Sequence, residues 1–504
     1  MKETVDRKKS VRTILGYSSG DILGGGAFTL ITVLFFTYLT TNVGLSAGLA
    51  GVVVLVGKIW DAISDPIMGI ISDHTHTKHG RRRIYFLIGI VPVLVTFTLL
   101  WYNFGITSQG GLAAYYILAY VLFSTAFTIV MVPYNSLLPE MVHNYKLRGK
   151  YSTFRMLFSN IAALVSATVP QLLVTALSSS VDTSTAYLVM GGIFGALYAL
   201  PLLITFFWTF EEPIPEVPDS ERVTLREMIK EFGQAFKNKT YRQYLSIFVF
   251  GQMATDVCST VTLTWALYML GIGEGNIGKS IIPGLVLIMA IFALPINSWI
   301  SNKWGKQASS YILLPVRIIS LVGALFLSAS SPLWFIYVVC AFNGIGASAG
   351  SYVPWVLLPD IPDSGFMITG KSNAGIYSSG ATFTRKFTSG FAIALTGIFL
   401  ECFGYVSSDT GEAVYQTTTA LFGIKFMFAI VPIVLSAITI YFALRYRLTP
   451  TRYKDMKNAI DYRINNGKPI EDKKIRKSCS MITGVEFDKM WVGSIENGIK
   501  ETVA

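Results

Sequence analysis

Three ionisable residues stand in a stretch that is otherwise apolar. The sequence GKIWDAISDPIMGIISDHTHTKHGRRR, residues 57–83, places Lys58, Asp61 and Asp65 among Ile, Trp, Ala and Met. If the stretch is helical, their i, i+3, i+7 spacing puts all three on one face. Two carboxylates one turn apart do not both ionise cheaply unless a proton or another cation lies with them. The pattern therefore predicts a site for a small cation, with Lys58 as a pairing partner of Asp61.

The composition of the 504-residue chain is that of a membrane protein. Hydrophobic residues make up 52% of the sequence and charged residues only 14%, whereas soluble globular proteins carry about 25% charged residues. The net charge of +11 would suggest a nucleic-acid partner in a soluble protein, but here the positive charges fall in polar loops and the tail. We therefore expect a multi-pass protein of the cell membrane that binds no nucleic acid.

Twelve apolar segments are long enough to cross a bilayer, since a crossing helix needs roughly 20 mostly apolar residues. The predicted spans are 14–40, 47–74, 84–103, 112–140, 151–177, 185–209, 241–270, 280–302, 309–330, 332–360, 375–404 and 418–446. The fold class expected from them is an all-α membrane protein.

Basic residues distinguish the two sides of the membrane. They gather in the N-terminus and in the loops that follow spans 2, 4 and 8, whereas the odd-numbered loops contain a single basic residue, Lys279. An excess of Lys and Arg marks the cytoplasmic side. Both termini are therefore predicted to be cytoplasmic, which agrees with an even number of spans.

The chain divides into two halves. We predict an N-terminal six-helix bundle over 1–210, a cytoplasmic central loop over 211–240, a C-terminal six-helix bundle over 241–446 and a charged cytoplasmic tail over 447–504. Two echoes support this division. VPYNSLLPE at the end of span 4 is similar to VPWVLLPD at the end of span 10. KHGRR after span 2 is similar to KWGKQ after span 8. Repeated six-span halves are the architecture of major-facilitator transporters, and we predict that fold.

Further ionisable residues lie at membrane depth outside span 2. Asp21 is in span 1, Arg155 in span 5, Asp256 in span 7, and Arg385 with Lys386 in span 11. Each would cost several kcal/mol against lipid, so such residues face a cavity or one another. For Arg155, near the cytoplasmic end of its span, extension of the side chain to the membrane surface is an equal alternative.

Asp21 lies in the glycine-rich stretch GYSSGDILGGGAF, with Tyr17 one turn before it on the same helix face. The glycines permit close approach of neighbouring helices. A protonated aspartate buried by helix packing is the plain structural interpretation. We favour contact with a substrate hydroxyl, because an aromatic ring beside a carboxylate is a common way to hold a polyol.

No metal site is expected from ligand spacing. The four cysteines, Cys258, Cys340, Cys402 and Cys479, show no metal-type pattern, and the histidines all stand beside basic clusters in predicted loops. A membrane-embedded enzyme would need a nucleophile with a base, or metal ligands, at membrane depth. Apart from His74 at the very end of predicted span 2, the spans contain no histidine, which argues against an enzyme.

The span-2 stretch KIWDAISDPIMGIISDHTHTKHGRRRIYFLIG resembles the signature of the glycoside–pentoside–hexuronide:cation symporters. The segments TIVMVPYNSLLPEM, VPWVLLPDIPD and TRKFTSGFAIALTGIFLECFGY match further segments of that family. The resemblance covers all twelve spans. It implies a secondary active transporter that moves a sugar or glycoside together with a cation by alternating access.

The resemblance also implies roles in the cation site. The two span-2 acids that bind Na+, Li+ or H+ in the family correspond to Asp61 and Asp65. A span-4 threonine of the same site corresponds to Thr128, and the span-11 lysine near it corresponds to Lys386. A third acid in span 4, which touches both cation and sugar, is replaced here by Met131. With fewer oxygen ligands we predict H+, which needs one suitable carboxylate, and keep Na+ at the two acids as the alternative.

On the substrate side, the resemblance assigns Asp21 to sugar contact and Arg155 to the same site, with Tyr17 beside them. Two positions depart from the family pattern. The stacking tryptophan of span 4 is Asn135 here, which we keep among the substrate-binding residues, and the lysine before the span-1 acid is Gly20. Galactoside specificity therefore does not carry over.

A second substrate class stays open. The same segments resemble lysophospholipid transporters, which share the span-2 acids, the PW.LLPD run and the span-11 lysine. Asp256 stands where some of them carry an acid, and we include it among the predicted substrate-binding residues. A lysophospholipid or other amphiphile is therefore the alternative substrate, and a membrane-embedded enzyme or a sensor is a more distant one. We expect a monomer with a small-molecule substrate and no cofactor beyond the coupling cation.

Overall fold

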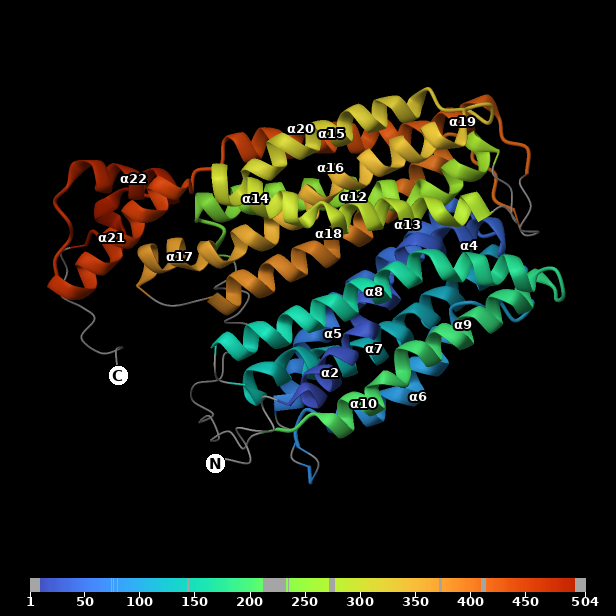
Figure 1. Ribbon diagram of the computed structural model, residues 1–504, viewed down its shortest axis with the longest axis horizontal. Helices are drawn as coiled ribbons and strands as arrows, with labels where there is room; N and C mark the ends of the chain where they lie inside the picture. Colours follow the sequence, from blue (N-terminus) through green and yellow to red (C-terminus); the bar gives the residue numbers. More distant parts are fainter. Residues whose placement is uncertain are drawn as a thin grey trace.

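The structure is a computed structural model of the 504-residue chain. It describes residues 10–73, 75, 77–78, 80–142, 145–211, 233, 235–271, 277–370, 374–408 and 414–494. Within these ranges all regular secondary structure is helical, and the long helices run side by side along the longest axis of the molecule (Figure 1). The predicted all-α class is confirmed.

Among the described residues, the first half of the chain supplies ten helical pieces. They are α2 (Val11–Ser19), α3 (Asp21–Leu30), the π-helical turn η1 (Ile31–Phe35), α4 (Phe36–Thr41), α5 (Ala47–Asp73), α6 (Ile84–Leu99), α7 (Gln109–Met141), α8 (Tyr145–Leu177), α9 (Thr183–Ala199) and α10 (Pro201–Trp208). Span 1 is thus segmented, as its glycine content suggests, whereas α5, which carries the two acids, is one helix of 27 residues.

The second half has a similar plan and continues into the tail. Its helices are α12 (Lys239–Leu270), α13 (Ile277–Phe292), α14 (Leu294–Trp304), α15 (Ala308–Leu325), α16 (Leu333–Leu357), the 3-10 turn η3 (Leu358–Asp360), α17 (Ile361–Thr369), α18 (Ala374–Cys402), α19 (Thr418–Lys425), the π-helical turn η4 (Phe426–Ile430) and α20 (Val431–Leu444).

Ten helical segments of the described ranges are long and apolar enough to cross a membrane. All ten coincide with predicted spans. Predicted spans 3 and 11 are also helical but fall outside this set, since α6 has only 16 residues, and the 29-residue α18 carries Arg385 and Lys386. The total of twelve crossings therefore stays a prediction.

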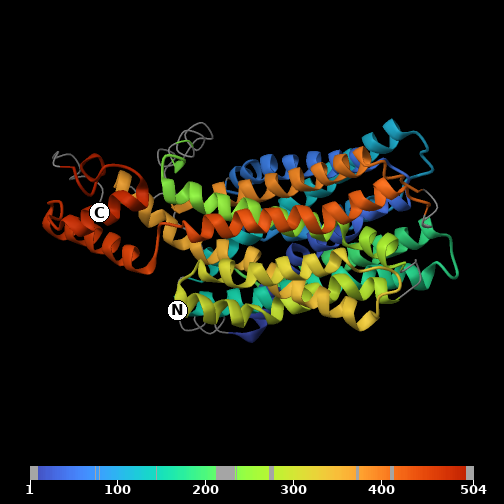
Figure 2. The ribbon, with the colours of Figure 1, turned by 90° about the horizontal axis from the view of Figure 1, so that it is seen from above.

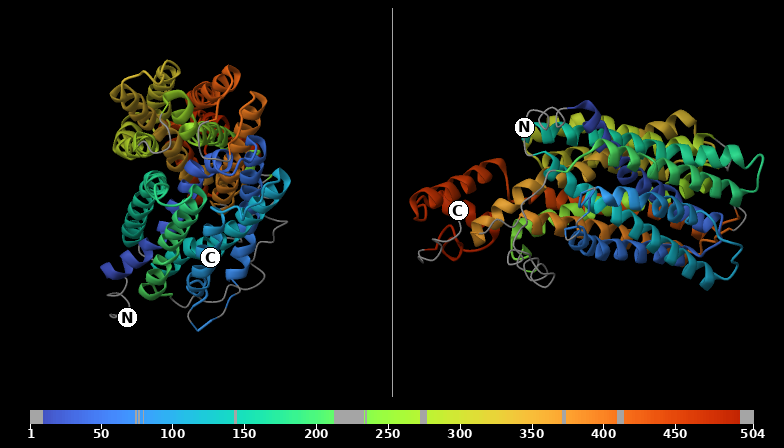
Figure 3. Two further views of the ribbon diagram at one scale, coloured as in Figure 1. Left: turned by 90° about the vertical axis from the view of Figure 1, so that its right-hand side faces the viewer. Right: turned by 90° about the horizontal axis from the view of Figure 1, so that it is seen from below.

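The helices form two groups when the molecule is viewed along its long axis (Figure 3). The first half of the chain, in blue to green, makes one group, and the second half, in yellow to red, makes the other. One end of the molecule holds both the start of helix α2 and the helices of the tail (Figure 1). The positions of the basic residues predict that this end is cytoplasmic. The opposite end is called the external end below.

The two groups meet along α5 and α18. A Cβ atom added to Gly51 would lie 2.8 Å from the Cα atom of Ala394, and one added to Gly397 would lie 2.0 Å from the carbonyl oxygen of Ala47. These four residues lie in the external half of the two helices. The backbones therefore touch where neither glycine has a side chain, and this contact is called the α5–α18 seam.

The central loop and the sequence echoes have partial structural counterparts. Residues 212–232 and 234 lie outside the described residues, so the boundary predicted at 211–240 stays a prediction. Glu211, just before them, accepts hydrogen bonds from the backbone amides of Arg81 and Arg82, at 2.7 and 2.9 Å. In the second half the two echo segments meet, because Lys306 pairs with Asp360 at 2.6 Å.

The tail is a folded helical unit, which the prediction of a charged tail did not anticipate. It contains α21 (Pro450–Asn466), α22 (Lys473–Thr483) and the 3-10 turn η5 (Phe487–Lys489), and it projects beyond the spanning helices (Figure 2). Met456, Cys479 and Met490 are fully buried within it. Burial raises the pKa of the Cys479 thiol to about 12, so this cysteine is unreactive.

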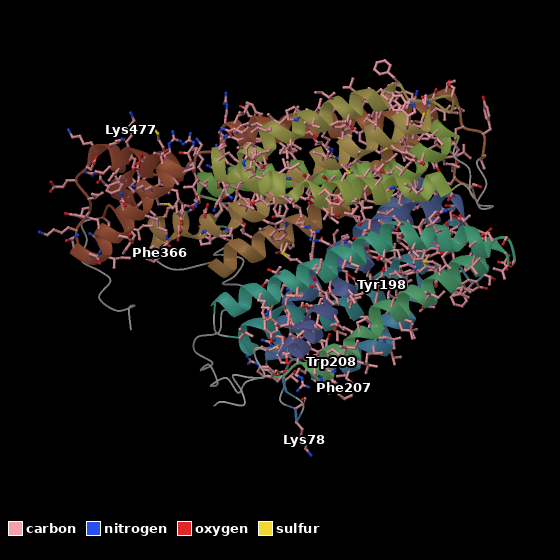
Figure 4. All side chains as sticks on the ribbon, in the orientation of Figure 1. Lys78, Tyr198, Phe207, Trp208, Phe366 and Lys477 are labelled. Carbon is pink, nitrogen blue, oxygen red and sulfur yellow. The ribbon has the colours of Figure 1, made fainter. Side chains whose placement is uncertain are left out.

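The tail packs against the predicted cytoplasmic end of the second half. Lys457 pairs with Asp363 of α17 at 2.8 Å, and Thr240 at the start of α12 donates to the carbonyl of Ile482 at 2.6 Å. Figure 4 labels Phe366 on α17 and Lys477 on α22 at this end of the molecule. The described contacts of the tail therefore fix α17, the helix that precedes α18.

The seam yields a prediction with a control on the same helix. Gly51→Ala introduces a methyl group against the backbone of α18 and should lower the thermal unfolding temperature of the purified protein, because overpacking costs about 1–3 kcal/mol. Gly69→Ala, on α5 where a Cβ meets nothing within 4 Å, should leave it unchanged or raise it, since Ala favours helix over Gly. Equal effects of the two substitutions would contradict a seam that requires glycine.

Candidate functional site

The two span-2 acids share one cation from the other half of the molecule. The ammonium group of Lys386 on α18 lies 2.9 Å from Oδ2 of Asp61 and also pairs with Oδ2 of Asp65, both on α5. Asp61 is fully buried, and the side chains of Asp65 and Lys386 are 28% and 16% exposed. The structure thus brings together, across the two bundles, three residues that stand far apart in the sequence.

A hydroxyl group from α7 completes this cluster. Oγ1 of Thr128 lies 3.2 Å from Oδ1 of Asp61 and 3.0 Å from Oδ1 of Asp65. A threonine has one hydroxyl hydrogen, so it can donate to only one of the two acids at a time. Ser64, which the sequence prediction omitted, places its Oγ 3.2 Å from Oγ1 of Thr128. The only sequence signal for Ser64 is its place between the two acids.

The charges of the cluster are unequal when all three groups are ionised. One ammonium group faces two carboxylates, which leaves one negative charge in a mostly buried site. Separating a buried charge from its partner costs about 3–5 kcal/mol, so Lys386 is held firmly as long as no other cation is present. A proton or Na+ at the acids would supply the missing positive charge and compete with the lysine.

The donor atoms of the cluster are all oxygens, which suits a proton or a hard cation such as Na+. Four carboxylate oxygens and the hydroxyls of Thr128 and Ser64 converge here, and hard cations take oxygen ligands. No group of three or more His, Cys, Asp or Glu that could hold a metal occurs among the described residues. The four histidines lie outside those residues.

Lys58 does not take the role that its spacing suggested. In the described structure it makes no ion pair with Asp61, and its ammonium group lies 3.6 Å from the ring centroid of Phe28. It is 7% exposed and packs against α18, since a Cβ on Gly390 would lie 2.8 Å from the Cβ of Lys58. Spacing on one face allowed the pair, but Lys386 reaches the same carboxylate from the opposite bundle.

The predicted substrate residues form a second polar cluster within the first half. Arg155 of α8 pairs with Asp21 of α3 at 3.2 Å and donates to Oδ1 of Asn135 on α7 at 2.7 Å. Asn135 is exposed, and the side chain of Arg155 is 28% exposed. Arg155 therefore faces its predicted partners and does not extend to the membrane surface. The cluster offers carboxylate, guanidinium and amide groups to a polar ligand.

Aromatic rings form one wall of this cluster. The ring of Tyr17 stacks on that of Tyr134, with centroids 4.7 Å apart and planes 10° apart, and the guanidinium of Arg155 lies 5.0 Å from the centroid of Tyr134. Tyr17 is fully buried. Tyr134, which the sequence prediction omitted, thus contacts both the predicted aromatic residue and the arginine.

One face of α7 connects the two clusters. Thr128, Met131 and Asn135 follow the same i, i+3, i+7 spacing as the charged residues of span 2. Thr128 contacts Asp61 and Asp65, and Asn135 contacts Arg155. Between them, the methyl group of Met131 lies 2.7 Å from a Cβ that would be built on Gly24, beside Asp21. An apolar residue therefore lies beside Asp21 on the α7 face that carries Thr128 and Asn135.

Asp256 belongs to a different neighbourhood. It is buried on α12 and accepts a hydrogen bond from Gln252 at 2.9 Å, while its Oδ2 has no hydrogen-bond partner in the described structure. Arg385, Lys58 and Arg317 interact with it electrostatically. The structure therefore places Asp256 with the charges at the junction of the bundles and not with Asp21 and Arg155.

Comparison with known proteins identifies the family. The family model for MFS/sugar transport proteins matches residues 16–450, which is most of the chain and includes both clusters. The chain belongs to this family. It is a multi-pass membrane transport protein of the major facilitator superfamily, and this membership excludes the membrane-embedded enzyme.

Individual relatives give finer comparisons. The isoprimeverose transporter of Lactiplantibacillus pentosus is 26% identical, over 87% of this chain and 90% of its own length. The sodium-dependent lysophosphatidylcholine symporter 1-A of Danio rerio is 23% identical, over 80% of this chain and 79% of its own. Among solved structures, a bacterial homologue of the human lysosomal transporter Spinster covers 86% of this chain and 95% of its own, with a TM-score of 0.63 and 13% identity. The last comparison supports the fold alone.

The cation cluster yields a prediction about Thr128. Thr128→Val keeps the shape of the side chain but removes the hydroxyl that contacts both acids. The apparent affinity for the coupling cation, measured from the cation dependence of uptake, should fall about tenfold, because a hydrogen bond to a charged group contributes about 1.5–3 kcal/mol.

Thr125→Val is the matched control, one turn earlier on α7. Its hydroxyl accepts a hydrogen bond from Trp60 at 2.8 Å and is not bonded to either acid. It should leave the cation affinity unchanged. If Thr128→Val also left it unchanged, the threonine would not belong to the cation site.

Proposed function

We propose that the protein is a symporter that couples uptake of a sugar or glycoside to the entry of a cation, and that this cation is H+. The observation that carries this proposal is the pairing of Lys386, from the second half, with both Asp61 and Asp65 of the first. Family membership supports transport, and the isoprimeverose transporter among the relatives supports a sugar substrate.

The coupling follows from competition for the two acids. Without a coupling cation, Lys386 neutralises part of their charge and links α18 to α5. When a cation binds, the ammonium group is no longer needed, and the ion pair between the bundles weakens. The two halves can then rearrange around the substrate, as alternating access requires. Cation arrival is thereby tied to movement of one bundle against the other.

The substrate is assigned to the cluster of Asp21, Arg155 and Asn135. Sugar hydroxyls both donate and accept hydrogen bonds, and this cluster offers a carboxylate acceptor, guanidinium donors and an amide that does both. Its members already bond to one another, which holds the donors and acceptors in place before a ligand arrives. We keep Tyr17 as a supporting residue of this site and propose that the carrier acts as a monomer in the cell membrane.

A proton is the proposed coupling ion because Met131 replaces an oxygen ligand. A Na+ ion is stabilised by several oxygens in a fixed shell, whereas a proton needs one carboxylate. The second candidate is a sodium-coupled carrier of lysophospholipids, which the lysophosphatidylcholine symporter among the relatives supports. In that case Thr128, Ser64 and backbone carbonyls would supply the remaining oxygens.

Asp65→Asn tests the coupling in proteoliposomes. The substitution removes the charge that the cation must neutralise while keeping the size of the side chain. It should abolish uphill accumulation of substrate but spare exchange of labelled for unlabelled substrate, because substrate binding does not use Asp65. Asp21→Asn is the matched control, since it alters the substrate cluster and should reduce both accumulation and exchange.

The same vesicles distinguish the ions and the substrates. Accumulation of labelled glycosides or pentosides that a protonophore abolishes, and that does not require Na+, would support the proposal. Accumulation that follows Na+ and ignores the protonophore would overturn the proton assignment. Transport of labelled lysophospholipid with no uptake of any sugar would overturn the sugar assignment.

A further inference from the structure

A carboxylate at the external end of α18 reaches the first turn of α5 in the other bundle. Oε2 of Glu401 accepts a hydrogen bond from the backbone amide of Gly48 at 2.6 Å and a second from the hydroxyl of Ser46 at 3.3 Å. Glu401 is exposed and lies outside both polar clusters described above. This contact joins the two halves at the end opposite to the predicted cytoplasmic side.

The contact satisfies a need of the helix that it touches. The first backbone amides of an α-helix have no partner within the helix, and this end carries partial positive charge. Ser46 satisfies only one of them from within the same chain segment, through a hydrogen bond of 3.4 Å from the amide of Leu49. Glu401 supplies a charged acceptor from the opposite bundle, at the start of the helix that carries Asp61 and Asp65.

The backbone around the contact is shaped to admit the carboxylate. A Cβ on Gly48 would lie 2.2 Å from Oε2 of Glu401, so a larger residue at this position would displace the carboxylate from its present contact. Gln109 of α7 fixes the preceding loop, because it donates to the carbonyl of Gly44 at 2.7 Å and accepts from the amide of Ser46 at 2.9 Å. The N-terminus of α5 is therefore held open toward Glu401 by its own half.

No ion pair of Glu401 with a lysine or arginine occurs among the described residues. Its carboxylate instead accepts hydrogen bonds from Ser46 and Gly48, so its charge lies against the amide end of α5. The α5–α18 seam lies directly below, where Gly51 and Gly397 allow the backbones to touch. Glu401, Ser46 and Gly48 together are called the external latch.

We propose that Glu401 is a positioning residue that keeps the carrier closed on the external side by capping the helix that holds the coupling acids. The proposal rests on the alternating-access function proposed above. Glu401 and its partners Ser46 and Gly48 belong to different bundles, so their contact has to break when the external side opens. Glu401, an exposed residue outside the cation and substrate clusters, would thus help to set which side of the carrier is accessible.

Labelling of a buried cysteine from outside tests the latch without any substrate. Ile393→Cys places a thiol at a position that is 2% exposed, beside the seam, in a Cys402→Ser background because Cys402 is the exposed cysteine and the other three are buried. With Glu401 present, a membrane-impermeant maleimide should label this thiol slowly. In Glu401→Ala the rate should rise about tenfold, which corresponds to about 1.4 kcal/mol in the closed–open equilibrium, and Glu401→Gln should lie between the two.

Asp182→Ala is the matched control. Asp182 is also an external carboxylate that caps a helix, accepting from the amide of Thr185 at 2.9 Å, but its partner lies in the same half. It should leave the labelling rate unchanged. An unchanged rate in Glu401→Ala, or an equal rise in Asp182→Ala, would overturn the proposal, whereas failure of the sugar or proton assignment would not affect this measurement.

A second experiment tests the latch even if the Glu401→Ala variant folds poorly. Ser46→Cys with Glu401→Cys, joined by a short reducible bis-methanethiosulfonate in the same Cys402→Ser background, should block uptake and regain it when the crosslink is reduced. Uptake that continues while the crosslink is intact would show that the external contact does not have to open, and would also overturn the proposal.

Discussion

The pairing of Lys386 with Asp61 and Asp65 is the interaction on which the rest of the arrangement depends. Three charged groups at membrane depth would each cost several kcal/mol against lipid, and they are tolerable only because they meet. They come from opposite bundles, so the two halves of the molecule cannot separate at this level without exposing unpaired charge. A single positive charge between two acids also leaves the site ready for one more cation.

The helices α5 and α18 contact each other at two depths of the membrane. Near the membrane centre, α5 and α18 are joined by the ion pairs of Lys386 with Asp61 and Asp65. Toward the external end they touch backbone to backbone at glycines, and Glu401 caps the start of α5. One face of α7 then relates the cation cluster to Asp21 and Arg155 through Thr128, Met131 and Asn135. Cation, substrate and external contact are therefore connected through three helices.

The sequence predicted the residues that are costly to place in a membrane, because their chemistry alone marks them. Asp61, Asp65 and Lys386 stand out in apolar runs, and the structure brings them together. Lys58 was assigned the wrong partner for a related reason: i, i+3 spacing places two residues on one face, but does not show that a lysine from the other bundle reaches the acid first. Helical periodicity likewise located the spans, while α6 is shorter than the predicted span.

Other features depend on contacts between segments that no local pattern reveals. Ser64 and Tyr134 are ordinary residues in apolar helices until Thr128 and Tyr17 are packed against them. Glu401 lies near the end of predicted span 11, and only the approach of Gly48 from the other bundle gives it a partner. In the tail, Met456 and Cys479 are apolar positions scattered among many charges, so composition indicated a charged segment where tertiary packing forms a buried core.

The central claim is that Lys386 makes the position of the bundles respond to the cation. Spin labels at Lys78→Cys and Lys303→Cys, exposed positions on opposite halves, report the distance between the predicted cytoplasmic ends by double electron–electron resonance in a Cys402→Ser background. With substrate present, adding the cation should change the distance distribution of the otherwise unaltered protein and of Arg385→Met, but not that of Lys386→Met. A cation-dependent change in Lys386→Met equal to that of the other two would contradict the account.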